Sequence, residues 1–253
     1  MRLGVIAGSG FDAVLKPRQS FDVETPWGDV TLHEARWKDG TDVLLAPRHG
    51  TGHRTGPHAV SFRALVQAMA DAKPDYVLGL NNVGGLKRAY PPGTWVVASD
   101  FLDLAEPSRG TFFLDRAVHT DLTKPYCPHL RDALARGAAV AGVEAKPGVY
   151  VTMPGPRLET PAEVRLLSEV ADVVGMTGAP EASLAKERGL CYAQLCLVSN
   201  LAAGLQDALP ARQIVNIGRA RLRGALDIVR GAAAALPATK NCDCARAPEL
   251  ARL

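Results

Sequence analysis

Long apolar runs, an excess of charge of one sign and CxxC cysteine pairs are all missing from this sequence of 253 residues. No run approaches the roughly 18 apolar residues that a membrane-spanning helix needs. The N-terminal segment reaches Gly8 too soon for a signal peptide. With 29 Lys and Arg against 26 Asp and Glu, the net charge of +3 provides no footprint of a nucleic-acid-binding protein. We therefore expect a cytoplasmic protein that binds neither membranes nor nucleic acids.

Cysteine usage gives no sign of a disulfide framework. The five cysteines are an odd number and lack the spacing of a zinc finger: Cys127, Cys191, Cys196, Cys242 and Cys244. This pattern favours reduced thiols over disulfides or a zinc site. Three histidines lie close together at positions 49, 53 and 58, but no carboxylate accompanies them. We therefore expect no bound metal.

Two common catalytic motifs are absent as well. The sequence contains no GxGxxG, so a dinucleotide site is not supported. It also contains no GxSxG, and Ser9 has no evident base nearby, which argues against a serine hydrolase.

Short apolar runs alternate with longer segments of helical spacing. The apolar runs lack polar alternation, which is typical of strands covered on both faces; they are residues 2–6, 43–46, 76–80, 95–98, 149–151 and 192–198. Helical spacing is found in residues 57–72, 128–141, 161–171, 180–188 and 211–236. This alternation predicts one α/β domain over residues 1–237, with a mixed, largely parallel sheet flanked by helices. Residues 238–253 are expected to form a loosely ordered tail.

Glycine and polar residues follow the predicted strands. They are Gly8-Ser9-Gly10, Arg48-His49, Asn81-Asn82-Val83-Gly84-Gly85 and Ser199-Asn200. Ligands of open α/β sheets bind outside the carboxyl ends of the strands, so these segments are expected to meet at one crevice. The glycine loops suit an anion, and the planar fork of Arg48 suits a phosphate group. Strand-ending turns and a surface salt bridge are the alternative interpretations.

Two further polar residues stand out between positions 149 and 200. Glu159 lies just before a predicted helix, where a carboxylate can instead stabilise the helix N-terminus. Asn200 can instead cap or turn the chain. If both residues face a ligand, the carboxylate can only accept hydrogen bonds, whereas the amide both donates and accepts.

Five motifs, in order over residues 1–230, resemble the trimeric purine nucleoside phosphorylase and 5′-methylthioadenosine phosphorylase family. They are GSG at 8–10, RHGxxHxxxPxxVxxRA at 48–64, NxVGG at 81–85, GPRLET at 155–160 and VGMTxxPExxxA at 174–185. The resemblance implies a nucleoside phosphorylase fold, a homotrimer and phosphorolysis of a purine nucleoside. Inorganic phosphate would be the co-substrate, and no cofactor is implied.

The resemblance also assigns roles to individual residues. Phosphate would be held by Ser9, Arg48, His49, Asn82 and Thr177, and the catalytic residues would be His49, Glu159 and Asn200. The sugar would rest on Met176, and the remaining substrate-binding positions would be Val83, Gly84, Leu158, Ala202, Ile214 and, from a neighbouring subunit, His119. Two positions depart from the family pattern: Leu158 replaces a phenylalanine of the purine pocket, and Asn82 replaces a small residue. Cys242 and Cys244 resemble a CxC pair that can oxidise in heat-stable members, although reduced thiols are expected here.

The hydrogen-bonding pattern of the base favours 6-oxopurines. Their N1–H can donate to Glu159 while the Asn200 amide donates to the base, whereas adenine reverses this pattern. Ile214 or Val215 stands where family members often carry a histidine for the 5′-hydroxyl, so the chain resembles the 5′-methylthioinosine phosphorylase branch. Inosine and guanosine stay open as substrates. The alternatives are a 5′-methylthioadenosine phosphorylase, a nucleosidase that uses water, and a catalytically silent nucleoside-binding homologue.

Overall fold

The computed structural model describes residues 1–8, 11–50, 55–105, 107–207 and 211–251. For Asp12, Pro107, Ser108 and residues 211–215 it describes the backbone alone. None of the described helices has the length and apolar character required to cross a membrane.

The described strands form one mixed sheet. In chain order they are β1 (Arg2–Ala7), β2 (Gln19–Val23), β3 (Val30–Arg36), β4 (Asp42–Pro47), β5 (Tyr76–Gly85), β6 (Trp95–Asp103), β7 (Ala145–Thr152), β8 (Val173–Gly175) and β9 (Tyr192–Leu201). Their spatial order is β2-β3-β4-β1-β5-β8-β7-β6-β9, and β5 also pairs with β9. Five strands therefore close into a ring, while β1 to β4 extend from one side of it through the pairing of β1 with β5.

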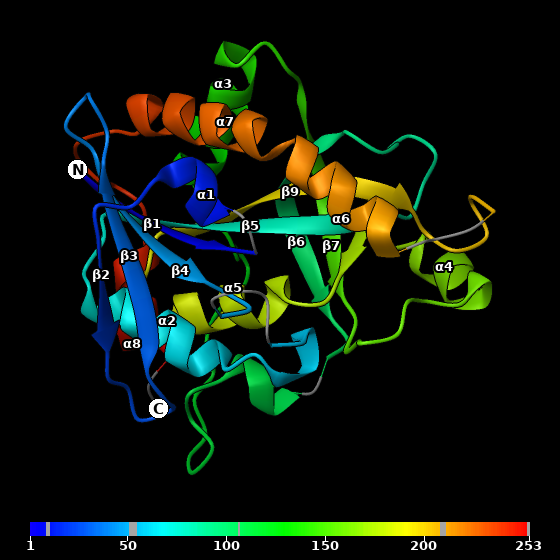
Figure 1. Ribbon diagram of the computed structural model, residues 1–253. Helices are drawn as coiled ribbons and strands as arrows, with labels where there is room; N and C mark the ends of the chain where they lie inside the picture. Colours follow the sequence, from blue (N-terminus) through cyan, green and yellow to red (C-terminus); the bar gives the residue numbers. More distant parts are fainter. Residues whose placement is uncertain (9–10, 51–54, 106, 208–210, 252–253) are drawn as a thin grey trace.

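Helices cover both faces of this sheet (Figure 1). They are α1 (Phe11–Leu15), α2 (Phe62–Asp71), α3 (Pro128–Val140), α4 (Pro161–Leu167), α5 (Gly178–Glu187), α6 (Ala211–Ala220), α7 (Leu222–Ala235) and α8 (Ala247–Leu250), with short 3-10 turns η1 (Pro57–Ala59), η2 (Pro107–Gly110) and η3 (Cys244–Arg246). In Figure 1, α1, α3, α6 and α7 lie on one side and α2, α5 and α8 on the other. The predicted fold class is confirmed.

Helices α3 and α7 approach each other closely at two glycines. A Cβ on Gly137 would lie 2.3 Å from the Ile228 carbonyl oxygen, and one on Gly231 would lie 2.9 Å from the Gly137 Cα. Only glycine fits at such a crossing, which lets the two backbones touch. The two glycines thus allow α7 to pack directly against α3.

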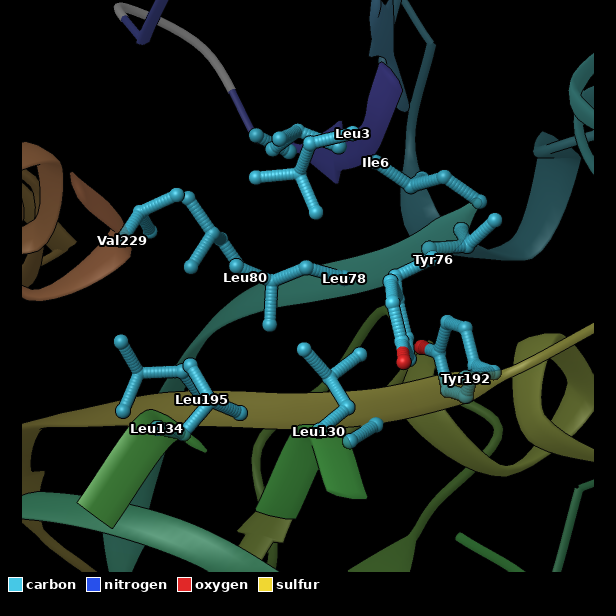
Figure 2. Close-up of a cluster of buried hydrophobic side chains, with 14 of the residues drawn as sticks. Leu3, Ile6, Tyr76, Leu78, Leu80, Leu130, Leu134, Tyr192, Leu195 and Val229 are labelled. Atoms are coloured by element: carbon cyan, nitrogen blue, oxygen red, sulfur yellow. The ribbon is translucent and has the colours of Figure 1, made fainter. Parts of the chain in front are cut away.

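The core lies where the open and closed parts of the sheet meet at β5. Figure 2 shows Leu78 and Leu80 of β5 between side chains of β1, β9, α3 and α7, which are Leu3, Ile6, Leu195, Leu130, Leu134 and Val229. All of these residues are buried. A close-packed centre of this kind holds the strand ends in fixed positions, because packed interiors resist deformation.

Two predicted loops are in fact strand. Residues 81–85 belong to β5 and residues 199–200 to β9, because each strand has a partner that continues alongside it. The parallel pairing of β5 with β9 runs from Val77 to Gly85, with a register shift between Val83 and Gly84. The polar residues of these segments therefore stand on rigid strands.

The sequence patterns did not predict α1, β2, β3, β8 and η2. Strand β2 is mostly exposed and polar, so it lacks the apolar run used to recognise strands. The tail also has more structure than expected. It contains η3 and α8, and it buries Cys244, Ala247 and Ala251 against the domain.

Candidate active site

A cavity of about 400 Å³ opens at the carboxyl ends of β1, β4, β5 and β9. Loops before α4 and α5 and the junction of α6 with α7 complete its wall. Ten predicted site residues line it: Arg48, His49, Asn82, Val83, Gly84, Leu158, Glu159, Met176, Thr177 and Asn200. The predicted meeting of strand ends at one crevice is therefore observed.

Of the other four predicted residues, two have side chains outside the described part of the chain and two do not line the cavity. Ser9 lies outside the described residues, and so does the side chain of Ile214, although α6 contains its backbone. Ala202 is 2% exposed and packs in a small apolar cluster behind the cavity. His119 lies elsewhere, where its backbone N–H donates to the Ala251 carbonyl oxygen at 3.4 Å. Its predicted contribution to a neighbouring subunit stays a prediction.

Arg48 forms a buried ion pair at the floor of the cavity. Its Nε donates to Glu181 Oε1, and its Nη2 donates to Glu181 Oε2 at 3.0 Å. Nη1 donates to the Leu80 carbonyl oxygen at 2.8 Å, and Nη2 also donates to the Ile6 carbonyl oxygen at 3.1 Å. These four contacts occupy most of the five N–H donors of a guanidinium. The fork of Arg48 holds Glu181 in this structure, and the role of Arg48 in binding phosphate stays a prediction.

Burial and charge act in opposite directions on Arg48. Burial lowers the pKa of the guanidinium, but the Glu181 carboxylate more than offsets this, so the pKa is raised overall. Arg48 and Glu181 are 4% and 0% exposed. Arg48 thus lines the cavity as one member of a buried ion pair.

A chain of hydrogen bonds continues the ion pair into the sheet. Tyr192 Oη donates to Glu181 Oε2 at 2.9 Å, and Gln194 Nε2 donates to Tyr192 Oη at 3.2 Å. Tyr126 Oη in turn donates to Gln194 Oε1 at 3.1 Å. Sequence analysis assigned no role to these residues. The available signal was an acidic residue, Glu181, inside an otherwise apolar helix segment.

The N-terminus of α5 is capped from inside the protein. Tyr150 Oη accepts hydrogen bonds from the backbone N–H groups of Thr177 and Gly178 at 3.3 and 3.2 Å. The next N–H, of Ala179, donates to Thr152 Oγ1 at 2.9 Å. A ligand in the cavity therefore meets side chains here and not the first amides of the helix.

Asn81 was expected at the crevice from its place after a strand, but the sequence assigned it no role of its own. Its Oδ1 accepts a hydrogen bond from Thr177 Oγ1 at 2.9 Å. Its Nδ2 is buried and has no hydrogen-bond partner among the described residues, although Asn81 lines the cavity. Buried polar groups are almost always paired, so an unpaired amide in a cavity wall indicates a ligand that accepts a hydrogen bond.

His49 lies beside Arg48 with its ring orientation set by the backbone. Its Nδ1 contacts the Thr55 carbonyl oxygen at 2.9 Å. Because a carbonyl oxygen only accepts, Nδ1 carries a proton. Together with Arg48, Asn81 and Thr177, His49 makes this end of the cavity polar.

Glu159, in the loop before α4, provides a hydrogen-bond acceptor in the cavity wall. The structure decides between its two interpretations, because the helix N-terminus is served by other residues. Thr160 and Glu163 form a reciprocal capping box, with Glu163 Oε2 accepting from Thr160 N–H at 2.8 Å. Arg157 pairs with both oxygens of Glu163 at 2.7 and 2.8 Å. Glu159 is thereby left to line the cavity, where it is 9% exposed.

Burial raises the pKa of the Glu159 carboxyl above its ordinary value of 4.5. The nearby Glu163 raises it further, while the hydrogen bond from its own backbone N–H and the charge of Arg157 lower it. A carboxylate that is costly to bury without a partner is ready to accept a hydrogen bond from a ligand.

Asn200 lies across β5 from this region and contacts its backbone neighbours. Its Oδ1 accepts from Ser199 Oγ at 2.9 Å, and its Nδ2 donates to the Leu201 carbonyl oxygen at 3.0 Å. The second N–H of the amide and a second lone pair on Oδ1 stay available. A Cβ on Gly84 would lie 3.2 Å from Asn200 Nδ2, so glycine is what lets the amide lie against β5.

The remaining wall is largely apolar and comes from residues that the sequence did not single out. They are Trp95, Leu195, Leu197, Leu222 and Ala225, with Arg219 and Arg221 nearby at the helix junction. None of the cavity residues belongs to a metal-binding cluster of the described structure.

Residues 2–229 match the Phosphorylase superfamily. The chain belongs to this superfamily. The predicted family is therefore confirmed.

Relatives of this phosphorylase carry closely related names. A probable S-methyl-5′-thioinosine phosphorylase of Methanopyrus kandleri is 39% identical, with 98% of this chain and 97% of the relative covered. A probable 6-oxopurine nucleoside phosphorylase of Moorella thermoacetica is 38% identical, with 98% of each chain covered. Among solved structures, methylthioadenosine phosphorylase from Schistosoma mansoni in complex with adenine is 27% identical. It has a TM-score of 0.89 and covers 99% of this chain and 96% of its own.

The ion pair of this phosphorylase yields a stability prediction. Glu181→Gln leaves the buried Arg48 guanidinium without a charged partner, and we expect a loss of about 3–5 kcal/mol in the free energy of unfolding. Replacing both members, as in Arg48→Met with Glu181→Leu, should cost much less because no charge is left buried. Chemical denaturation of the single and double variants measures this difference. Equal losses in both would contradict the account.

Proposed function

We propose that this chain catalyses the phosphorolysis of 6-oxopurine ribonucleosides, with 5′-methylthioinosine as the preferred substrate. Phosphate oxygen bonds to C1′ as the bond from C1′ to the base nitrogen breaks. The products are the free purine, which takes up a proton, and the (5-methylthio)ribose 1-phosphate. The observation that carries the proposal is the single cavity that joins hydrogen-bond donors at one end to the Glu159 carboxylate at the other.

The donor end supports inorganic phosphate as the co-substrate. The His49 proton on Nδ1 is already donated to the Thr55 carbonyl oxygen, so the role of His49 at the phosphate stays a prediction. The unpaired Asn81 Nδ2 and the remaining Arg48 N–H can donate to phosphate oxygens, and the Thr177 hydroxyl can join them by turning from Asn81 Oδ1 to the phosphate. Because Glu181 neutralises much of Arg48, these neutral donors contribute a large share of the binding. Asn82 lines the same end, and we assign Ser9 to it by the resemblance. No cofactor is needed for this reaction.

The acceptor end supports a 6-oxopurine as the base. Glu159 can accept from N1–H of hypoxanthine or guanine, whereas N1 of adenine carries a lone pair that the carboxylate would repel. Asn200 can donate to the leaving base and stabilise the negative charge that develops on it, which favours the transition state over the bound substrate. Met176, Val83 and Gly84 line the cavity with these residues and are assigned to the sugar and base.

The apolar wall supports a methylthio group at the 5′ position. Trp95, Leu222 and Ala225 line this part of the cavity. Among their side chains, the Trp95 indole N–H is the one group that could form a hydrogen bond with a 5′-hydroxyl. A relative named S-methyl-5′-thioadenosine phosphorylase, from Pyrococcus abyssi, is 31% identical, so the adenine-type reaction is the competing candidate. A homotrimer in which His119 closes a neighbour's cavity, and a cytoplasmic location, stay predictions.

Base release distinguishes these reactions. We expect hypoxanthine release from 5′-methylthioinosine to require phosphate and to exceed release from inosine, with little adenine from 5′-methylthioadenosine. Chromatographic quantification of the free base, with and without phosphate, is the measurement. Adenine release in preference to hypoxanthine would overturn the base assignment. Release without phosphate would indicate a nucleosidase, and no release from any substrate would support a silent binding protein.

The raised pKa of Glu159 leads to a pH prediction. As the pH falls through this pKa, the carboxyl gains a proton, loses the negative charge that strengthens its hydrogen bond from N1–H, and gains an O–H that can donate to N1 of adenine. The ratio of kcat/KM for methylthioinosine to that for methylthioadenosine should therefore fall toward acid, beginning above the pH at which an ordinary glutamate titrates.

The matched variant for this prediction is Glu159→Gln. It should lower kcat/KM for methylthioinosine about 10- to 100-fold, since a hydrogen bond to a charged group contributes about 1.5–3 kcal/mol. It should also make the substrate ratio independent of pH in this range. Glu163→Gln, next to the same loop but outside the cavity, is the control and should keep the pH dependence, moved toward acid because the charge of Glu163 helps to raise the pKa of Glu159. An unchanged ratio profile in Glu159→Gln would refute the role of Glu159.

A further inference from the structure

Four cysteines from three separate segments of the chain meet outside the cavity. The sulfur atoms of Cys127, Cys191, Cys242 and Cys244 all lie within 4.8 Å of one another. Two of the separations are 3.9 Å, from Cys127 to Cys242, and 3.5 Å, from Cys191 to Cys242. None of these residues lines the cavity, so the cluster is independent of the proposed function.

The arrangement of the sulfur atoms matches a tetrahedral metal site. In such a site with metal–sulfur bonds of about 2.3 Å, neighbouring sulfur atoms lie about 3.8 Å apart. The two separations of 3.5 and 3.9 Å lie on either side of that value. Hydrophobic packing alone does not require four thiol groups to gather their sulfur atoms within 4.8 Å of one another.

Two of the four cysteines are held by the sheet. The backbone N–H of Cys127 donates to the Tyr192 carbonyl oxygen at 2.8 Å, and the Cys191 carbonyl oxygen accepts from Val77 N–H at 2.8 Å. Cys127 is also the N-cap residue of α3, and its side chain makes no capping hydrogen bond to that helix.

The other two cysteines come from the tail. Cys244 begins η3 and is 5% exposed, while Cys242 is partly exposed and leaves a route to solvent. Just before them, Lys240 Nζ donates to the Asp75 carbonyl oxygen at 3.0 Å. The tail is therefore brought to the sheet at the point where its two sulfur atoms complete the set.

We propose that Cys127, Cys191, Cys242 and Cys244 bind one zinc ion through four thiolates. Four metal–sulfur bonds form, the four thiol protons pass to solvent, and no electron is transferred. With four protein ligands and no open position, the site is structural, and it fastens the tail to β9 and to the start of α3.

This proposal differs from the expectation of reduced thiols and no metal. That expectation depended on spacing along the chain, whereas the ligands come from three separate segments that only the fold brings together. The competing chemistry is disulfide formation, which requires sulfur atoms about 2.05 Å apart. All five cysteines are free in the structure.

Metal analysis of the full-length chain, purified with reductant and without chelator or affinity metal, is the direct test. We expect one zinc ion per chain. Replacement by cobalt should give the intense visible bands and thiolate charge-transfer absorption of tetrahedral sulfur coordination. A reduced chain that contains no zinc and develops no such spectrum with cobalt would overturn the proposal. So would intact-mass evidence that the isolated protein carries disulfides among these four cysteines.

Variants locate the ion. Cys242→Ser and Cys244→Ser should lose the bound zinc and the cobalt spectrum. Cys196→Ser is the matched control, because Cys196 is buried but lies outside the cluster, and it should keep both. If a serine variant does not fold, alkylation of the wild-type protein replaces it. A chelator should then accelerate alkylation of the four cluster cysteines but not of Cys196, and equal rates with and without chelator would contradict the site.

Discussion

The buried ion pair between Arg48 and Glu181 is the interaction on which the candidate active site depends. Arg48 follows β4, and it also binds the carbonyl oxygens at Ile6 of β1 and Leu80 of β5. Glu181 belongs to α5 and is tied to β9 through Tyr192. One guanidinium therefore connects three strand ends with the helix below them. Such a pair contributes little net stability, because desolvation offsets much of the attraction. Its effect is to fix the relative positions of the elements that form the cavity floor.

The two ends of the cavity follow from this floor. On the side of Arg48, the side chains of Asn81, Thr177 and His49 line a common space, and Asn81 Nδ2 has no hydrogen-bond partner within the part of the chain that the structure describes. On the other side, the capping box of α4 satisfies the helix terminus and leaves Glu159 free of that task. An anion can thus bind on the side of Arg48 while a base that donates from N1 binds on the side of Glu159.

The parts of the fold that could be predicted are those that local composition determines. Apolar runs without polar alternation located β1, β4, β5, β6, β7 and β9, since each is buried by neighbours on both faces. Strand β2 was not predicted because it is mostly exposed and polar, and so lacks an apolar run. The carboxyl ends of β5 and β9 were predicted as loops because Asn and Gly disfavour strands locally. In the structure, the pairing of the two strands overrides that preference.

The candidate site divides in the same way. Residues at strand ends could be found from position and type, as with Arg48, Glu159 and Asn200. Their partners could not, because Glu181 lies 133 positions after Arg48 and only the fold brings the two together. The same holds for the four cysteines, which no spacing rule connects. Sequence reasoning identified the surface that faces a ligand more fully than the groups that hold this surface in place.

The most direct test of the account is a crystal structure of the chain with hypoxanthine and phosphate. The account predicts hypoxanthine N1 within hydrogen-bond distance of the Glu159 carboxylate. It also predicts phosphate in contact with Asn81 Nδ2 and the Thr177 hydroxyl, above an intact pair of Arg48 and Glu181. Phosphate bound elsewhere, or a base whose N1 faces away from Glu159, would contradict it.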